Sequence, residues 1–242
     1  MDKIRISATN LGELALETFC PRCFWIKLHC QHKMPYSIFP GIFNSIDAYT
    51  KKVVDSYFDQ QGQVPGWLSQ LGDIESYIKP PHHSKFNVDH GETGILLTGT
   101  PDAVFRYRDG AHCITDFKTA KYTGNQDKLF PKYEAQLNAY AYIGERYGLS
   151  PISSLYLIYM EPSTDVNTAA SEEAVTSDGF VMWFVGKVLE VRLEPDEIIH
   201  SLLARTREIY EMGTYPEGAR GCEDCDKLSD LLGVVVGTPL GA

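Results

Sequence analysis

Hydrophobic positions in the first quarter of the chain recur with a helical period. Apolar residues return about every 3.6 positions over residues 11–28 and again over residues 43–60. This spacing predicts helices that each bury one face. Between residues 62 and 92, Gly, Pro and His interrupt the period and turn-forming residues recur, so we predict mostly loop in that stretch.

From residue 94 the pattern changes to short runs of β-branched and aromatic residues. Such runs cover residues 95–100, 102–108 and 111–118, and they are typical of strands. Asp109 and Gly110 separate the last two runs, which predicts a hairpin.

The second half of the chain alternates helix and strand patterns. We predict helices over residues 131–147 and 195–213, and strands over 153–160 and 179–193. The intervening residues 162–179 are small, polar and acidic, which predicts a mobile loop. This order of elements predicts one α/β domain over residues 1–242, with the sheet in the middle.

Composition limits the class of protein. With 242 residues, 43% of them hydrophobic and 12% aromatic, the chain can bury a large core, so disorder of the whole chain is excluded. The net charge of −10 excludes a generally basic surface, so any contact with nucleic acid must be local. No apolar stretch approaches the roughly 20 residues of a membrane span, and no secretion signal begins the sequence. We therefore expect a cytoplasmic protein without a membrane partner.

Two carboxylates and an ammonium fall on the two strands of the predicted hairpin. Side chains alternate along a strand, so Asp116 and Lys118 share one face, while Cys113 and Phe117 point to the other. Together with Asp102, these groups suit hydrolysis of a phosphodiester assisted by Mg²⁺ or Mn²⁺, with Lys118 orienting water or stabilising charge. The alternative is that Asp102 caps a turn and that Asp116 and Lys118 form a surface pair on an edge strand.

The predicted helix over residues 131–147 carries polar groups on one face. Gln136 and Tyr140 are four residues apart and therefore neighbours, and Lys132 lies one turn earlier. The alternative is an ordinary polar helix surface.

Four of the six cysteines form two Cys-x-x-Cys pairs at opposite ends of the chain. Cys20 pairs with Cys23, and Cys222 pairs with Cys225. Soft thiolates at this spacing suit zinc or an iron–sulfur cluster, and a site that uses both pairs would join the two ends. The alternative is four reduced cysteines without a metal.

Three motifs, in order, resemble a known nuclease family. Residues 98–102 (TGTPD), 116–119 (DFKT) and 136–140 (QLNAY) resemble the GxPD, DxK and QxxxY motifs of the RecB-like branch of the PD-(D/E)XK nucleases. Cys20-Pro-Arg resembles the first cluster ligand of the iron–sulfur members of that branch, which include AddB-type exonucleases and CRISPR-associated nucleases. The resemblance extends from about residue 6 to residue 226.

The resemblance implies a restriction-endonuclease-like fold, in which a mixed central sheet is flanked by helices. It implies that Asp102 and Asp116 ligate Mg²⁺ or Mn²⁺, that the main-chain carbonyl of Phe117 adds a ligand, and that Lys118 is the catalytic lysine.

On the helix that follows, the resemblance implies that Gln136 and Tyr140 help to position Lys118 and DNA. Family members usually carry a metal-binding His in the helix before the sheet, and residues 41–52 contain none. Asp47 is our prediction for that position. A carboxylate there keeps a ligand but adds negative charge, so altered metal preference or weak activity is expected.

The cysteines depart from the family pattern as well. Related nucleases have one N-terminal and three C-terminal cluster ligands, whereas this chain has two and two, so Cys23 would replace the missing third C-terminal ligand. The resemblance implies a [4Fe–4S] cluster bound by Cys20, Cys23, Cys222 and Cys225, and the spacing of the pairs leaves Zn²⁺ open.

The function expected from the resemblance is that of a metal-dependent DNA exonuclease on single-stranded or end-containing DNA. A nuclease-fold protein that binds DNA or a protein partner without cleaving is the alternative, which the missing His and the net charge of −10 favour. A cysteine-clamped RNA-processing enzyme is a third.

Overall fold

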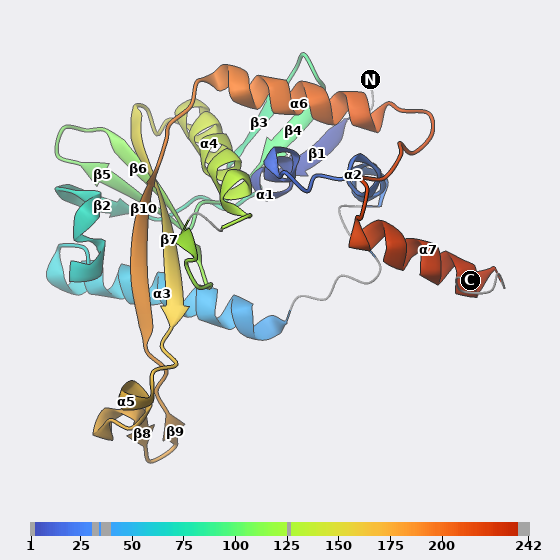
Figure 1. The fold of residues 1–242 in the computed structure, drawn as a ribbon. Coiled ribbons are helices and arrows are strands. Elements are labelled where there is room, and N and C mark those ends of the chain that lie inside the picture. The colour runs from blue at the N-terminus through green and yellow to red at the C-terminus, as the bar shows by residue number, and fades with distance from the viewer. Residues whose placement is uncertain (1–2, 31–33, 35–39, 125–126, 237–242) are drawn as a thin grey trace.

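The computed structural model describes residues 3–30, 34, 40–124 and 127–236. Its sheets are flanked by helices, which confirms the predicted α/β class (Figure 1). The helices are α1 Ala8–Leu11, α2 Pro21–His29, α3 Gly41–Gln61, α4 Phe130–Tyr147, α5 Val166–Ala169, α6 Asp196–Tyr210 and α7 Glu223–Val235. The strands are β1 Ile4–Ser7, β2 Ile74–Ile78, β3 Asn87–His90, β4 Ile95–Thr98, β5 Ala103–Tyr107, β6 His112–Lys118, β7 Ile152–Pro162, β8 Val175–Thr176, β9 Gly179–Phe180 and β10 Phe184–Val191.

A mixed five-stranded sheet has the order β10-β7-β6-β5-β2. Its middle strand β6 pairs antiparallel with β5 and parallel with β7. The predicted hairpin is confirmed, and Gly110 has a φ of 90° in its turn, a conformation that glycine adopts without steric cost. A smaller sheet has the order β1-β4-β3, so β1 is an edge strand.

Helices cover both faces of the larger sheet. Ile114 of β6 packs in a core with α4, whereas Cys113 and Phe117 pack in a second core with α3 and a short 3-10 helix at Gly66–Leu71. The predicted alternation along β6 is therefore confirmed, and it places Asp116 on the α4 side. Helix α4 ends at Gly148, whose φ is 106°.

Some sequence predictions were wrong about local structure, and two elements were not predicted. Residues 62–92 contain β2 and β3 in place of a long loop, and residues 162–179 contain α5, β8 and part of β9. The helical pattern predicted over residues 11–28 forms α2 in its second half, but its first half forms only the end of α1 and one 3-10 turn, Gly12–Ala15. Neither β1 nor α7 was predicted. The strands among these elements are short and need a partner strand elsewhere, so they lack a sustained local period; β1, for example, pairs with β4, with Ile4 opposite Ile95. Helix α7 has 13 residues, of which only Cys225 is buried, so no buried apolar face marks it.

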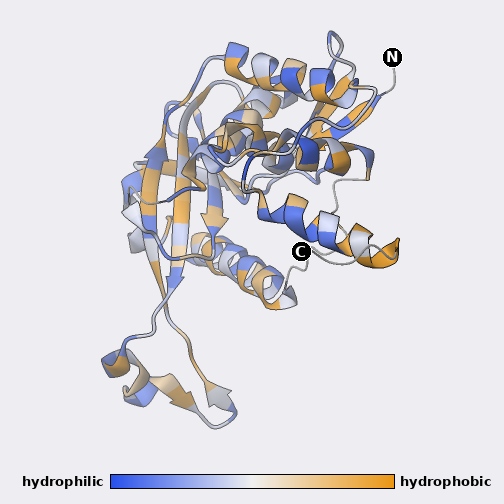
Figure 2. Ribbon diagram, turned by 45° about the vertical axis from the view of Figure 1, so that its right-hand side comes forward, coloured by the Kyte–Doolittle hydropathy of each residue, from blue (hydrophilic) through white to orange (hydrophobic). Residues whose placement is uncertain are grey.

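Strands β7 and β10 continue beyond the rest of the sheet and carry α5, β8 and β9 as an arm that projects from the body (Figure 1). Figure 2 shows hydrophilic and hydrophobic residues alternating along α6, which buries Ile199, Leu203 and Ile209 on one face. In α7 only Cys225 is buried. Among the described helices, none is long and apolar enough to cross a bilayer.

Candidate functional site

The β5–β6 hairpin brings together a buried carboxylate, Asp116, and a largely buried one, Asp102. Asp102 directly precedes β5, and its Oδ2 accepts a hydrogen bond of 2.6 Å from the backbone N–H of Phe117. Asp116 lies near the end of the central strand β6 and is only 3% exposed. Both alternatives for these residues are wrong, because Asp102 bridges two strands and Asp116 is buried in the middle of the sheet.

Burial and mutual repulsion oppose the ionisation of this pair. Burial first, and then the neighbouring carboxylate of Asp116, raises the pKa of Asp102 to about 7. Burial also raises the pKa of Asp116, against the attraction of Lys118. Buried carboxylates that repel each other favour a cation, so this pair suits a divalent metal ion.

Lys118 is held beside Asp116. Its Nζ lies 2.5 Å from Asp116 Oδ2 and 4.6 Å from the ring centroid of Tyr133. It also donates a hydrogen bond of 3.3 Å to Gln136 Oε1. These contacts fix the ammonium at the carboxylate pair.

Helix α4 supplies the remaining predicted residues. Gln136 Nε2 donates to Asp116 Oδ1 at 3.1 Å and to the hydroxyl oxygen of Tyr140 at 2.7 Å. Tyr140 packs so closely on Gly99 that a Cβ there would lie 2.5 Å from its ring, which explains the glycine of the TGTPD segment. The polar helix face is therefore an internal one, and the structure brings Gln136 and Tyr140 to the carboxylates.

Phe117 contributes to both sides of this strand. Its backbone N–H binds Asp102, as described, and its side chain packs in the second core, with its ring centroid 6.4 Å from that of Trp67. Its main-chain carbonyl as a metal ligand stays a prediction.

Helix α3 adds an acid and an unpredicted lysine. Lys51 Nζ lies 2.7 Å from Asp47 Oδ2 and 2.6 Å from Asp102 Oδ1. Burial lowers the pKa of Lys51, but Asp102 and Asp47 outweigh that effect and raise it. Sequence reasoning missed Lys51; its signal was the i,i+4 spacing from Asp47.

The ammonium of Lys51 therefore lies between two of the predicted metal ligands. Asp47, Asp102 and Asp116 are not among the groups of close ligand atoms found in the described part of the chain. Asp47 reaches the site through Lys51, and its role as a direct ligand stays a prediction.

A cavity of about 490 Å³ lies beside this site. Lys118, Asp47 and Lys132 line it, together with residues of α1, α3 and α4. Burial lowers the pKa of Lys132, although Glu13 opposes the shift. The cavity therefore presents two lysines and room for a substrate next to the carboxylates.

The two Cys-x-x-Cys pairs meet in a second site. Cys20 and Cys222 precede α2 and α7, and Cys23 and Cys225 lie in the first turns of those helices. The sulfur of Cys23 lies 3.6 Å from that of Cys222 and 3.5 Å from that of Cys225, and all four sulfurs lie within 4.8 Å of one another. The prediction that one site joins both ends of the chain is confirmed in its geometry.

The backbone is shaped around these sulfurs. Cys20 Sγ accepts a hydrogen bond of 3.2 Å from the N–H of Ala219. A Cβ at Gly218 would lie 2.8 Å from Cys225 Sγ, so a larger residue there would displace this sulfur. The site can therefore hold a thiolate-bound metal ion or cluster.

Three of the thiols, those of Cys20, Cys23 and Cys225, differ in acidity. Burial raises the pKa of Cys20, but hydrogen bonds from the backbone of Cys23 and Ala219 outweigh it and lower the pKa to about 7. Burial raises the pKa of Cys225 to about 11 and also raises that of Cys23. Thiols of such different acidity would all need to ionise to bind one metal, which a dipositive ion promotes. Of the other two cysteines, Cys113 is a core residue as predicted, and Cys30 is exposed.

Comparisons with protein families, curated proteins and solved structures do not identify a function. No protein-family model matches the sequence, and no curated protein matches it. Among 13 matching chains of solved structures is the crystal structure of SSO0001, with 14% sequence identity and a TM-score of 0.42. The match covers 89% of this chain and 81% of that one.

Proposed function

We propose that this protein is a metal-dependent nuclease of the RecB-like PD-(D/E)XK type, built on a restriction-endonuclease-like sheet. The observation that carries the proposal is the buried network of Asp102, Asp116, Lys118, Gln136 and Tyr140, in which three separate sequence motifs meet. Burying charged and polar groups in such a network lowers the stability of the fold unless a cation or a substrate binds to them.

Asp102 and Asp116 would hold Mg²⁺ or Mn²⁺, with the carbonyl of Phe117 as a further ligand. When bound, such an ion activates water and neutralises charge in the transition state of phosphodiester hydrolysis. The backbone N–H of Phe117 fixes Asp102, and Gln136 fixes Asp116.

Lys118 would stabilise the charge that develops on the phosphate. Its ammonium lies at the cavity wall and is held by Asp116, Gln136 and the ring of Tyr133. Tyr140 acts on Asp116 through Gln136, because its hydroxyl oxygen accepts a hydrogen bond from the same Gln136 amide that donates to Asp116. Gln136 and Tyr140 are therefore positioning residues.

Lys51 would act as a resident cation when no metal is bound. It neutralises Asp102, and Asp47 holds it in place. A divalent ion on Asp102 must compete with this ammonium, which predicts weak metal affinity. The same observation favours the second candidate function, a nuclease-fold protein that binds DNA or a protein partner without cleaving it.

The four cysteines would hold one tetrahedral ion such as Zn²⁺. A Zn–S distance of about 2.3 Å places the sulfurs of a tetrahedral site about 3.8 Å apart. The closest sulfur pairs here are 3.5 Å and 3.6 Å apart. A [4Fe–4S] cluster attaches each thiolate to a different iron around a bulky core, which requires sulfurs farther apart than 4.8 Å. Zn²⁺ is therefore our proposal over the cluster implied by the resemblance.

DNA is the proposed substrate, cleaved from an end. The test compares linear with circular single-stranded DNA of the same sequence, each incubated with purified protein and Mn²⁺. An exonuclease degrades the linear strand and spares the circle. Equal cleavage of both strands would contradict the exonuclease, and binding of both without cleavage would support the second candidate.

A further inference from the structure

A second cavity lies on the other side of α1 from the carboxylate site. Its volume is about 540 Å³, and it is lined by β1, the end of α2 and the last residue of α6. Thr9 lines the carboxylate cavity and its neighbour Asn10 lines this one, so a single turn of helix separates the two.

The charged residues that line this cavity are basic, in contrast to the acidic protein as a whole. Its lining includes Lys3, Arg5 and His29 and contains no Asp or Glu, although the net charge of the chain is −10. Lys3 pairs with Asp89 on the surface, with the two side chains 63% and 53% exposed. Exposed ion pairs of this kind contribute little, so Lys3 can exchange its partner for a phosphate at small cost.

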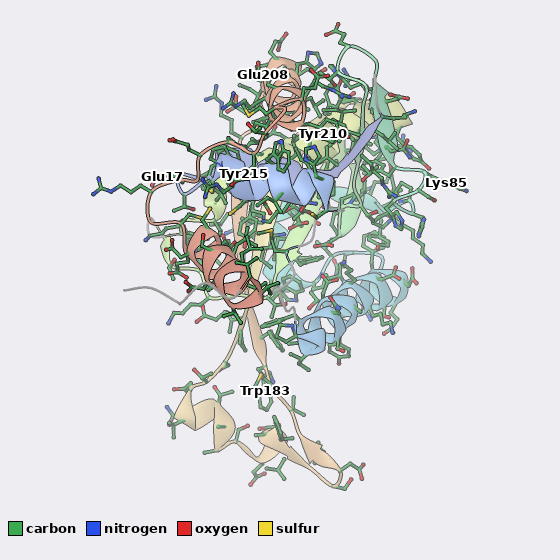
Figure 3. All side chains as sticks on the ribbon, turned by 90° about the vertical axis from the view of Figure 1, so that its right-hand side faces the viewer. Glu17, Lys85, Trp183, Glu208, Tyr210 and Tyr215 are labelled. Carbon is green, nitrogen blue, oxygen red and sulfur yellow. The ribbon has the colours of Figure 1, made fainter. Side chains whose placement is uncertain are left out.

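Stacked aromatic rings form one wall. The ring of His29 lies 4.0 Å from that of Trp25 and 4.6 Å from that of Tyr210, with only 7° between the His29 and Tyr210 planes. Trp25 is anchored by a hydrogen bond of 3.2 Å from its Nε1 to the carbonyl oxygen of Met212. Tyr210, the last residue of α6, is labelled in Figure 3.

We propose that this cavity binds the part of a single-stranded nucleic acid that extends from the carboxylate site. The proposal rests on the proposed function and adds the path of the strand over α1. Arg5 and Lys3 would contact phosphates, and a base inside the cavity would contact the rings of His29 and Tyr210. Positive charge next to a rigid aromatic wall is the combination that holds single strands without reading their sequence.

The competing occupant is a peptide. Strand β1 is the edge of its sheet, and an extended peptide could pair with it. The basic lining of this cavity and the two lysines that line the carboxylate cavity favour the nucleic acid, since both cavities offer cations to its phosphates.

The experiment measures binding of fluorescent single-stranded DNA to the Asp116→Asn protein in Mn²⁺, using strands of about 4 and about 16 nucleotides. A strand of about 4 nucleotides held at the carboxylate site has little length left for the second cavity, whereas a strand of about 16 nucleotides can occupy both. We expect Tyr210→Leu to weaken binding of the long strand by roughly tenfold, as loss of one stacked base predicts, and to leave the short strand unchanged. Tyr210→Phe, which keeps the ring, should bind like the parent.

Arg5→Ala tests the phosphate contact. It should weaken binding of the long strand and reduce the slope of log affinity against log salt by about 0.7, the value for one contact to a single strand. Arg108→Ala is the matched control, because Arg108 pairs with Asp73 at the far end of the sheet.

Unchanged binding of the long strand in both variants would overturn the proposal, as would equal weakening of both strands. Those results would leave cleavage at the carboxylate site untouched. Failure of the parent protein to bind either strand, together with no cleavage by the wild type, would instead overturn the proposed function.

Discussion

The carboxylate site and the four-cysteine site differ in how their negative charge is balanced in the absence of a metal. At the carboxylate site, Lys118 and Lys51 already neutralise much of the negative charge, so the network is held together before any metal arrives. At the cysteine site, by contrast, four thiols face one another, and each must lose a proton before they can bind a metal together. A metal is therefore expected to serve chemistry at the first site and folding at the second.

The two sites also differ in how far apart their residues lie along the sequence. The carboxylate network spans one hairpin and the next helix, whereas the thiol pair Cys23 and Cys222 is separated by 199 residues. Loss of the cysteine metal would free both ends of the chain, but loss of the carboxylate metal would leave the sheet intact.

The largest effect is expected for Lys118→Met. Removing the ammonium that would stabilise developing charge should lower the cleavage rate by about 10²-fold or more. Lys121→Met is the matched control, because Lys121 is 75% exposed and pairs only loosely with Glu161 at 3.8 Å. Rates are measured on end-labelled single-stranded DNA in Mn²⁺, and wild-type activity of Lys118→Met would show that the site is elsewhere.

Cys222→Ser should lower the stability of the protein, in contrast to the loss of cleavage expected at the carboxylate site. We expect it to release the bound metal and to make both ends of the chain sensitive to protease. A loss of about 2 kcal/mol would lower Tm by roughly 4–8 °C for a chain of this size. Cys30→Ser is the control, since Cys30 is exposed and outside the site. Unchanged metal content and Tm in Cys222→Ser would show that the two pairs share no ion.

Lys51→Met should strengthen metal binding at the carboxylate site. Without the competing ammonium, the affinity for Mn²⁺ measured by calorimetry should rise, by roughly tenfold for about 1.4 kcal/mol of lost competition. Lys52→Met, on the exposed side of α3, should bind Mn²⁺ like the wild type. Weaker Mn²⁺ binding by Lys51→Met would mean that Lys51 supports the metal site.

The smallest expected effect is on the pH dependence of stability. The pKa of Asp102 is raised to about 7 from its ordinary value of 3.8, so the stability of the metal-free protein is greater below that ordinary value and is lost as pH rises toward 7. Mn²⁺ favours the ionised carboxylate, so its stabilising effect on Tm should be larger at pH of about 8 than at pH of about 5. Asp102→Asn should flatten this difference. A stabilising effect of Mn²⁺ that does not change with pH in the wild type would contradict the assignment.

The candidate site was predictable from the sequence because its parts are local. Alternation along β6 placed Asp116 and Lys118 together, and helical spacing placed Gln136 beside Tyr140. Two Cys-x-x-Cys pairs were enough to predict a shared site. Lys51 was missed because its contact with Asp102 depends on how α3 packs across the hairpin, which no local pattern records.

The fold was predictable where an element carries its own period. Helices α3, α4 and α6 and the central strands have long periodic or apolar runs, and their predicted positions agree with the structure. Strands β1, β2 and β3 are four or five residues long and depend on partners elsewhere in the chain. Their pairing is a property of the whole fold, so the sequence around them resembles a loop.

The central claim is that the network around Asp116 cleaves nucleic acid with a divalent metal. The most direct test follows cleavage of end-labelled single-stranded DNA as Mn²⁺ is added to metal-depleted protein, for the wild type and for Asp116→Asn. We expect no cleavage before Mn²⁺ is added, a rate that rises to saturation in the wild type, and at least about 10²-fold less in the variant. Cleavage that does not require added metal, or equal rates in both proteins, would contradict the claim.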